Sequence, residues 1–314
     1  MIVWGLFKKL VIADRLVLLT TEIFTNKPEK YVGLYIFIGL IASSIRVYAD
    51  FSGGVDTVRG VGQMFGIKMP LNFQRPYFSA SLPEYWRRWH ITLNNWWRDY
   101  LFYPLVLSKP MAKISKFTRQ HISAGLGKIV GVYIGINVVR VVNAMWHGAN
   151  LYRIVSGFYF GALMVLGMVF APVFKKTIGI LHINIDSFSW KLFRITRTFL
   201  LVCLGGVFVS TGGVGSGFAA LYSIIKDFNP WILNYDSIFL IGLSGWDARI
   251  IIISLSILLI VGIMQENGIA IRETLERQNI VFQWIVLIGG IIMVLLWGQY
   301  GWGYNPVSFI YRGF

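Results

Sequence analysis

Charged residues are scarce in this sequence. They make up 14% of the 314 residues, whereas a typical soluble domain has about 25%. Hydrophobic residues make up 56%, and two runs, Val155–Phe174 and Ile280–Trp297, have almost no charge. A membrane-spanning helix needs about 20 mainly apolar residues. The composition therefore excludes a soluble globular domain and predicts a multi-spanning membrane protein.

Acidic residues are the scarcer of the two charges. The chain has 14 Asp and Glu against 29 Lys and Arg, a net charge of +15. In a soluble protein this balance would suggest nucleic-acid binding, but here no stripe of Lys and Arg lies on an otherwise soluble face. Basic residues of membrane proteins collect in cytoplasmic loops. We therefore expect a lipid bilayer, and no nucleic acid, as a partner.

Several kinds of site are excluded by what is missing. The single cysteine, Cys203, lies in an apolar run and cannot form an internal disulfide. The sequence has no Walker loop, no Gly-x-Ser-x-Gly elbow, and neither a His-x-x-x-His pair nor a cysteine cluster. We therefore expect no metal and no tightly bound cofactor.

Hydrophobic runs and basic stretches together predict a topology. Val3–Phe24 is interrupted by charges, and we interpret it as one helix that is buried by protein or lies at the interface. The basic stretches Ser108–Lys128 and Lys175–Arg197 contain almost no acid and are predicted to be cytoplasmic. The predicted spans are Tyr31–Ala49, Ile129–Met145, Val155–Phe174, Thr198–Tyr222, Ile250–Met264 and Ile280–Trp297.

Two further segments predict irregular or interfacial structure. Asp50–Gln74 is rich in glycine, and irregular backbone at membrane depth needs a cover of protein or a cavity, so we expect a re-entrant or cavity-lining segment. Ser81–Leu105 begins with a capping serine, Pro83 and Glu84, which predicts a helix with many tryptophans. The fold class is thus an all-α polytopic transmembrane bundle with re-entrant or interfacial helices, in one domain over residues 1–314.

His147 is the first candidate for chemistry. It follows Trp146 at the end of a predicted span, and an ionisable group inside a membrane protein is a functional candidate because its burial is costly. Histidine is also suited to proton transfer near neutral pH. A histidine with a purely structural role is the alternative.

His90 is the second candidate. On a continuous helix, Trp86, His90 and Asn94 would share one face. Arg87 and Arg88 beside them are suited to anionic groups or lipid phosphates. An aromatic interfacial helix with cationic anchors explains the same residues equally well.

Five stretches together carry a resemblance to a known family. The segment Pro70–Leu105 contains Trp86-Arg-Arg-Trp-His90, and Trp146-His147-Gly148 follows later. With them, the chain resembles the membrane-bound O-acyltransferase (MBOAT) family, in the bacterial branch of alginate O-acetyltransferases and the D-alanyl transfer protein of teichoic acid synthesis. The other matching stretches are Gly5–Arg15, Tyr48–Gly53 and Tyr304–Tyr311.

The resemblance implies a reaction and its participants. An acyl group, acetyl in the first instance, would move from a thioester, acetyl-CoA or an acyl carrier protein, to hydroxyls of an extracytoplasmic polysaccharide or teichoic acid. It also implies the bacterial cytoplasmic membrane and a secreted SGNH-type acyltransferase as a partner. His147 would be the general base and His90 a second active-site histidine. The expected substrate-binding residues are Trp146, Asn94, Arg87, Arg88, Asp50 and Ser52, with Asp99 supporting the helix.

The chain also departs from the family pattern. It begins close to the Gly5–Arg15 segment and resembles the C-terminal two-thirds of a family member. Gly54-Val55-Asp56 replaces the usual Tyr-Ser-Asp, and Asn150–Gly161 lacks the Trp and His often seen there. Three alternatives therefore stay open: D-alanyl transfer, a transporter or channel, and an inactive partial chain. Transporters often have two similar halves, and no such repeat is visible here.

Overall fold

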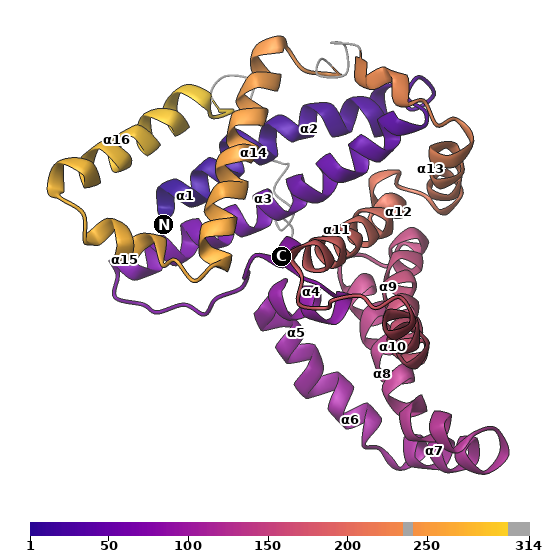
Figure 1. Cartoon of the computed structure of the whole chain (residues 1–314). Coiled ribbons are helices and arrows are strands. Elements are labelled where there is room, and N and C mark those ends of the chain that lie inside the picture. Colours follow the sequence, from indigo (N-terminus) through magenta and orange to yellow (C-terminus); the bar gives the residue numbers. More distant parts are fainter. Residues whose placement is uncertain (235–240, 301–314) are drawn as a thin grey trace. The chain divides into compact units, whose positions relative to one another are not determined.

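The structure, a computed structural model, describes residues 1–234 and 241–300. This part of the chain is built from helices and contains no strand (Figure 1). It divides into two compact units, which we call the first unit (Met1–Pro70 with Ala219–Phe314) and the second unit (Leu71–Phe218). The all-α prediction is confirmed. The prediction of a single functional domain is untested, because the division into two compact units does not show whether the units function together or separately.

Six helical segments are long and apolar enough to cross a membrane. In Ile280–Trp297 only 6% of the residues are buried within the protein, as expected for a helix surrounded by lipid. The prediction of a multi-spanning membrane protein is confirmed. The segments are α3 (Leu34–Met64), α8 (Ala124–Trp146), α9 (Leu151–Val169), Phe188–Ser210, α14 (Gly245–Glu266) and α16 (Ile280–Trp297).

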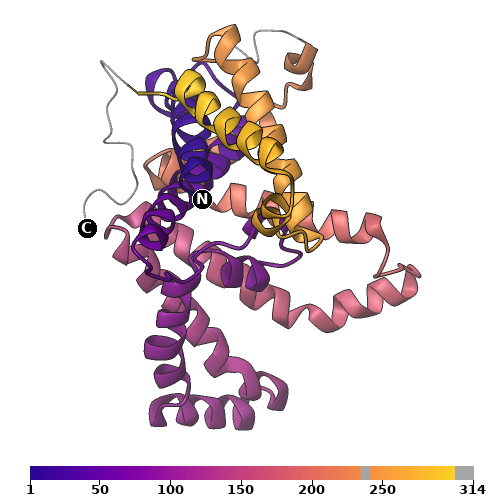
Figure 2. The ribbon, with the colours of Figure 1, turned by 90° about the vertical axis from the view of Figure 1, so that its left-hand side faces the viewer.

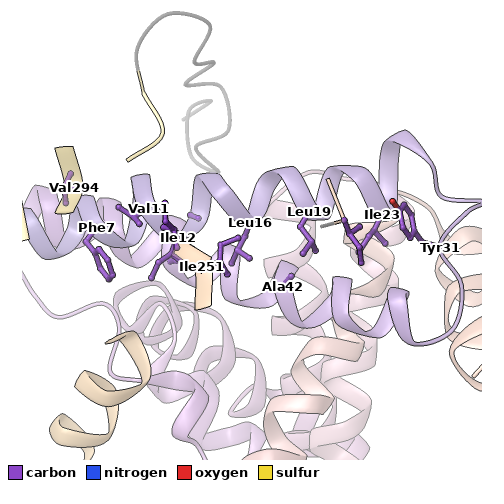
Figure 3. Close-up of a cluster of buried hydrophobic side chains, with 14 of the residues drawn as sticks. Phe7, Val11, Ile12, Leu16, Leu19, Ile23, Tyr31, Ala42, Ile251 and Val294 are labelled. Atoms are coloured by element: carbon purple, nitrogen blue, oxygen red, sulfur yellow. The ribbon is translucent and has the colours of Figure 1, made fainter. Parts of the chain in front are cut away.

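The N-terminal segment of the first unit is helical from Ile2 to Asn26, as the sequence predicts. Leu16, Leu19 and Ile23 recur at helical spacing and pack on α3 within one apolar cluster (Figure 3). The segment is therefore buried by protein, which is one of the two interpretations offered for it. Its parts are α1 (Ile2–Leu6), η1 (Phe7–Ala13), α2 (Asp14–Thr21) and η2 (Glu22–Asn26), of which η1 and η2 are π-helical.

The glycine-rich stretch after Asp50 is helical as far as Met64, so the prediction of irregular backbone is wrong over that part. Helix α3 continues through it to Met64 and ends where Gly66 turns with a φ of 74°. A Cβ on Gly53 would lie 2.7 Å from the carbonyl oxygen of Gly5. The glycines in the helix thus allow two backbones to approach closely, as small residues do between membrane helices.

The rest of the first unit follows the second unit in the chain. Ser244 caps α14 in a reciprocal capping box with Asp247, and Asn279 caps α16. The predicted resemblance over Tyr304–Tyr311 lies outside the described residues. The remaining elements are α13 (Val214–Lys226), which begins in the second unit, η5 (Pro230–Asn234) and α15 (Ile271–Glu276).

The second unit is organised around α8. Helix α8 pairs with α9 in a tight hairpin, and α6 and the helix before it also contact α8. Both views show α7 across the ends of α6 and α8 (Figures 1 and 2). The elements are η3 (Pro76–Phe78), α4 (Leu82–Arg88), α5 (Ile91–Trp97), the π-helical η4 (Arg98–Phe102), α6 (Tyr103–Val106), α7 (Lys109–His121), α10 (Ala171–Ile180), α11 (Phe188–Gly205) and α12 (Val207–Ser210).

Two predicted spans have wrong boundaries. The span placed at Thr198–Tyr222 begins earlier, at Phe188, where Ser187 caps α11. Lys191, Arg194 and Arg197 therefore lie in this helix and not in a loop. Long basic side chains are tolerated near a helix end because they can reach out to water. Helix α9 ends at Val169, short of the predicted Phe174, and Pro172 opens α10.

Candidate active site

His90 lies in a sharp turn, not within a helix. Ser81 caps the preceding helix, α4, as predicted, by accepting a hydrogen bond from the Glu84 amide. Helix α4 ends at Arg88, and His90 takes a left-handed conformation with φ 45° and ψ 55°. The prediction of one helix over Ser81–Leu105, with Trp86, His90 and Asn94 on a single helical face, is therefore wrong.

The chain before α4 holds this turn in place. Phe73 and Trp89 form an antiparallel bridge. The Ile91 amide donates to the Asn72 carbonyl at 3.0 Å, so the turn's backbone is paired on the far side of His90 as well. A left-handed residue other than glycine is strained and persists where its surroundings fix it. Pairing with a segment 18 residues away in sequence provides that constraint.

Asn72 also orients the His90 ring. Its Oδ1 lies 3.1 Å from His90 Nδ1 and accepts hydrogen bonds from the amide and the hydroxyl of Thr92, at 3.2 and 3.0 Å. A backbone amide can only donate, so the Asn72 atom is an acceptor. The neutral His90 ring then carries its proton on Nδ1, which leaves a lone pair on Nε2.

Asn94 connects this turn to α8. Its Nδ2 donates to the Trp89 carbonyl at 2.7 Å and to the His90 carbonyl at 3.3 Å. Its Oδ1 accepts from Arg140 Nη2 at 2.9 Å. The guanidinium carbon of Arg140 in turn lies 4.2 Å from the ring centre of Trp86. The residues that the sequence placed on one helix, Trp86 and Asn94, are thus brought together through Arg140.

His147 lies directly after the last residue of α8. The Trp146 ring packs edge-on against it, with centroids 4.7 Å apart. Gly148, with a φ of 129°, lets the chain turn into α9. A few residues earlier, Trp97 Nε1 donates to Asn143 Oδ1 at 3.0 Å. This second bond fastens α5 to the end of α8 that carries His147.

Both histidines are neutral at physiological pH. Burial, with a smaller contribution from His147, lowers the pKa of His90 to about 4. Burial also lowers the pKa of His147 to about 4, with a second contribution from the charge of Arg153. The two rings thus lie close enough to act on each other electrostatically. Both can accept a proton at pH 7, as a general base must.

The other residues predicted for this region have varied settings. Arg88 pairs with Glu84 at 2.7 Å, whereas Arg87 is exposed. Trp146 is half-exposed, and Asp99 is exposed and pairs with Arg98 at 2.8 Å. The settings of Arg87 and Arg88 are compatible with contacts to lipid phosphates or to substrate, and their assignment as substrate-binding residues remains a prediction.

Asp50 and Ser52 belong to the first unit. Asp50 pairs with Lys9 at 2.7 Å, and Ser52 accepts from Lys8 Nζ at 2.9 Å. Lys8 also pairs with Asp56 at 2.7 Å. These ion pairs explain how charged residues are accommodated in the apolar N-terminal segment. The assignment of Asp50 and Ser52 as substrate-binding residues remains a prediction.

Three residues of this site were not predicted from the sequence: Arg140, Asn72 and Asn143. A signal for Arg140 was present, because it is a charge in the middle of the predicted span Ile129–Met145. Asn72 and Asn143 have no such signal, since isolated asparagines are common. Within residues 1–234 and 241–300, no group of three His, Cys, Asp or Glu is placed to hold a metal ion.

Comparison with known proteins gives curated relatives. No family model matches the chain. A probable alginate O-acetylase of Pseudomonas syringae is 30% identical over 230 residues, which are 73% of this chain and 38% of that protein. A peptidoglycan O-acetyltransferase of Helicobacter pylori is 28% identical over 60% of this chain and 34% of its own length. A teichoic acid D-alanyltransferase of Bacillus subtilis is 31% identical over 52% of this chain and 38% of its own length.

The fold and the site together define a multi-pass membrane protein with two half-buried, neutral histidines and a buried arginine in one unit. The chain belongs to the membrane-bound O-acyltransferase family, which confirms the predicted resemblance. It spans less than half the length of the curated relatives that it matches.

Proposed function

We propose that this protein transfers an acetyl group from a thioester donor to hydroxyls of an extracytoplasmic polysaccharide, in the bacterial cytoplasmic membrane. The observation that carries this proposal is the pair of neutral histidines, His90 and His147, in the second unit. The named activities of the relatives, O-acetylation of alginate and of peptidoglycan, support the same chemistry.

In the proposed step, the acceptor hydroxyl gives its proton to the neutral His147 ring while its oxygen attacks the thioester carbonyl carbon. The carbon–sulfur bond then breaks, and the protonated histidine returns the proton to the leaving thiolate. Such general base catalysis typically contributes about 10²- to 10⁴-fold to the rate. His90 Nε2, a lone-pair acceptor, would accept a hydrogen bond from a second hydroxyl of the acceptor and so position that substrate.

The position of His147 along α8 fits an extracytoplasmic acceptor. The basic helix α7 lies at the other end of α8, and α8 has 23 residues, a length of about 35 Å. If α7 is cytoplasmic, as its charge predicts, His147 lies toward the outer face. Acetyl-CoA or an acyl carrier protein as the donor, and a secreted SGNH-type acyltransferase as a partner, belong to this proposal.

Charge around the histidines favours acetyl over D-alanyl transfer. Burial is the main cause of the lowered pKa of His147, and the cation of Arg153 adds to it. The cation of Arg140 is bonded to the asparagine beside the His90 turn. A D-alanyl group carries an ammonium, which two cations would repel. An acetyl group is neutral and meets no such repulsion.

The test is ester formation in cells that lack their own enzyme. These cells would express the chain, its His147→Ala form, and a form extended upstream in the gene. Esters would be released from the polymer by mild alkali and identified by mass, which separates acetate from D-alanine. Acetate that depends on His147 would support the proposal. D-alanine in place of acetate would overturn the choice of acyl group, and no ester from any form would overturn the activity.

A further inference from the structure

Arg140 is a buried cation in a membrane-spanning helix. It lies in the C-terminal part of α8 and is 9% exposed. Burying a charge is costly unless an opposite charge compensates it. In the described part of the chain, Arg140 forms a hydrogen bond with Asn94 and stacks on Trp86, but no carboxylate forms an ion pair with it. An anion from outside the chain would complete this arrangement.

The guanidinium of Arg140 is held rigidly. The Trp86 ring lies against its face at 4.2 Å, and Asn94 Oδ1 accepts from Nη2 on one edge. Asn94 is itself anchored by its bonds to the carbonyls of Trp89 and His90. A donor group fixed in this way loses little conformational entropy when a ligand binds.

Two buried donors of this stacked pair have no acceptor. Within the described residues, neither Arg140 Nη1 nor Trp86 Nε1 has a hydrogen-bond partner, although both atoms are buried. Buried polar groups are normally paired, and each exception needs an explanation. An oxyacid group has two or more acceptor oxygens and a negative charge, so it would satisfy both donors and compensate the cation.

The distance from His147 places this pair beside the proposed reaction. Arg140 precedes His147 by seven residues, which corresponds to about 10 Å along the helix and nearly the same face. The pair and His147 would therefore contact different parts of a bound molecule. The pair is near enough to hold another part of the same substrate.

We propose that Arg140 and Trp86 form a binding site for a carboxylate or phosphate group of a substrate. The identity of that substrate rests on the proposed function, because the anion could be the carboxylate of an acidic sugar in the acceptor or a phosphate of the donor. The site would fix the position of the substrate along α8 and favour acidic substrates over neutral ones.

The test is a binding measurement that requires no acyl transfer. The purified full chain in detergent would be titrated with two pairs of probes. One pair is a six-residue oligo-uronate and its carboxyl-reduced counterpart, and the other is coenzyme A and pantetheine. Three variants accompany the wild type: Arg140→Gln, Trp86→Phe, and Trp97→Phe as a matched control. The control removes an indole N–H whose acceptor is Asn143. Thermal unfolding confirms that each variant is folded.

We expect the wild type to bind one anionic probe about 10- to 100-fold more tightly than its neutral counterpart, as hydrogen bonds to a charged group allow. Arg140→Gln removes this preference, Trp86→Phe reduces it, and Trp97→Phe keeps it. A preference for the uronate identifies the acceptor, and a preference for coenzyme A identifies the donor. Equal binding within both pairs, or a preference that survives in Arg140→Gln, overturns the inference. A lack of acyl transfer with the preference intact would contradict only the proposed function.

Discussion

The pH dependence of acyl transfer should show that the pKa of His147 is lowered. Its pKa is lowered to about 4, mainly by burial. The neutral ring is the active form of a base, so activity should persist as the pH falls and be lost only near pH 4. At pH 5.5, a group with a pKa of about 4 is roughly 97% neutral, whereas an ordinary histidine with a pKa of about 6.5 is roughly 9% neutral.

The assay is kcat/KM for acetyl transfer to purified polysaccharide in membranes, between pH 8 and pH 5. We expect a change of less than about 1.1-fold from pH 8 to pH 5.5, because the neutral fraction hardly changes. An ordinary histidine would give a fall of about 10-fold over the same range. A fall of that size with a midpoint near pH 6.5 would refute the reasoning.

A substitution beside His147 should raise the pH at which activity is lost. The Trp146 ring packs on His147 with centroids 4.7 Å apart. Trp146→Ala should admit water, weaken the effect of burial and raise the pKa toward its ordinary value. A fall in activity should then appear between pH 7 and pH 5. Trp96→Ala is the control, since this exposed ring contacts Trp97 and Tyr100, and its pH profile should match the wild type.

Three further predictions concern stability and activity. His90 has a φ of 45°, so His90→Gly should be about 1 kcal/mol more stable than His90→Ala in thermal unfolding. Both variants should lose acyl transfer. Equal stability of the two would argue against a strained turn. A Cβ on Gly157 would lie 2.6 Å from a carbonyl oxygen of α8, so Gly157→Ala should lower the free energy of unfolding by about 1–3 kcal/mol. Gly167→Ala is the control and should not lower it, because a Cβ there meets nothing within 4 Å. Lys8 is 2% exposed and pairs with Asp56, so Lys8→Met should destabilise the protein by about 3–5 kcal/mol, and adding Asp56→Asn should restore part of the loss in the same unfolding measurement.

Much of the architecture could be predicted from local sequence. The six spans were recognised because hydrophobicity and length are properties of each segment alone. The Ser81 cap was predicted correctly for the same reason, since its hydrogen-bond partner lies three residues away. His147 and His90 were singled out as ionisable groups in apolar surroundings, and the structure brings the two into electrostatic contact.

Features that depend on distant residues were not predictable. The glycines after Asp50 suggested a break, but α1 and η1 pack against them and the helix continues. The aromatic segment suggested one helix, but pairing with Asn72 stabilises a left-handed turn at His90. In both cases the local preference is weak, and a tertiary contact decides the conformation.

The sequence by itself determined the class of this protein, a helical membrane protein, and its two candidate histidines, because apolar runs and buried ionisable groups are visible residue by residue. Only the tertiary structure decided what surrounds those histidines. Arg140, Trp86 and Asn94 come from three helices, and their stacking and hydrogen bonds exist only once α4, α5 and α8 meet. The lowered pKa of both rings is likewise a consequence of burial, which depends on residues from several segments.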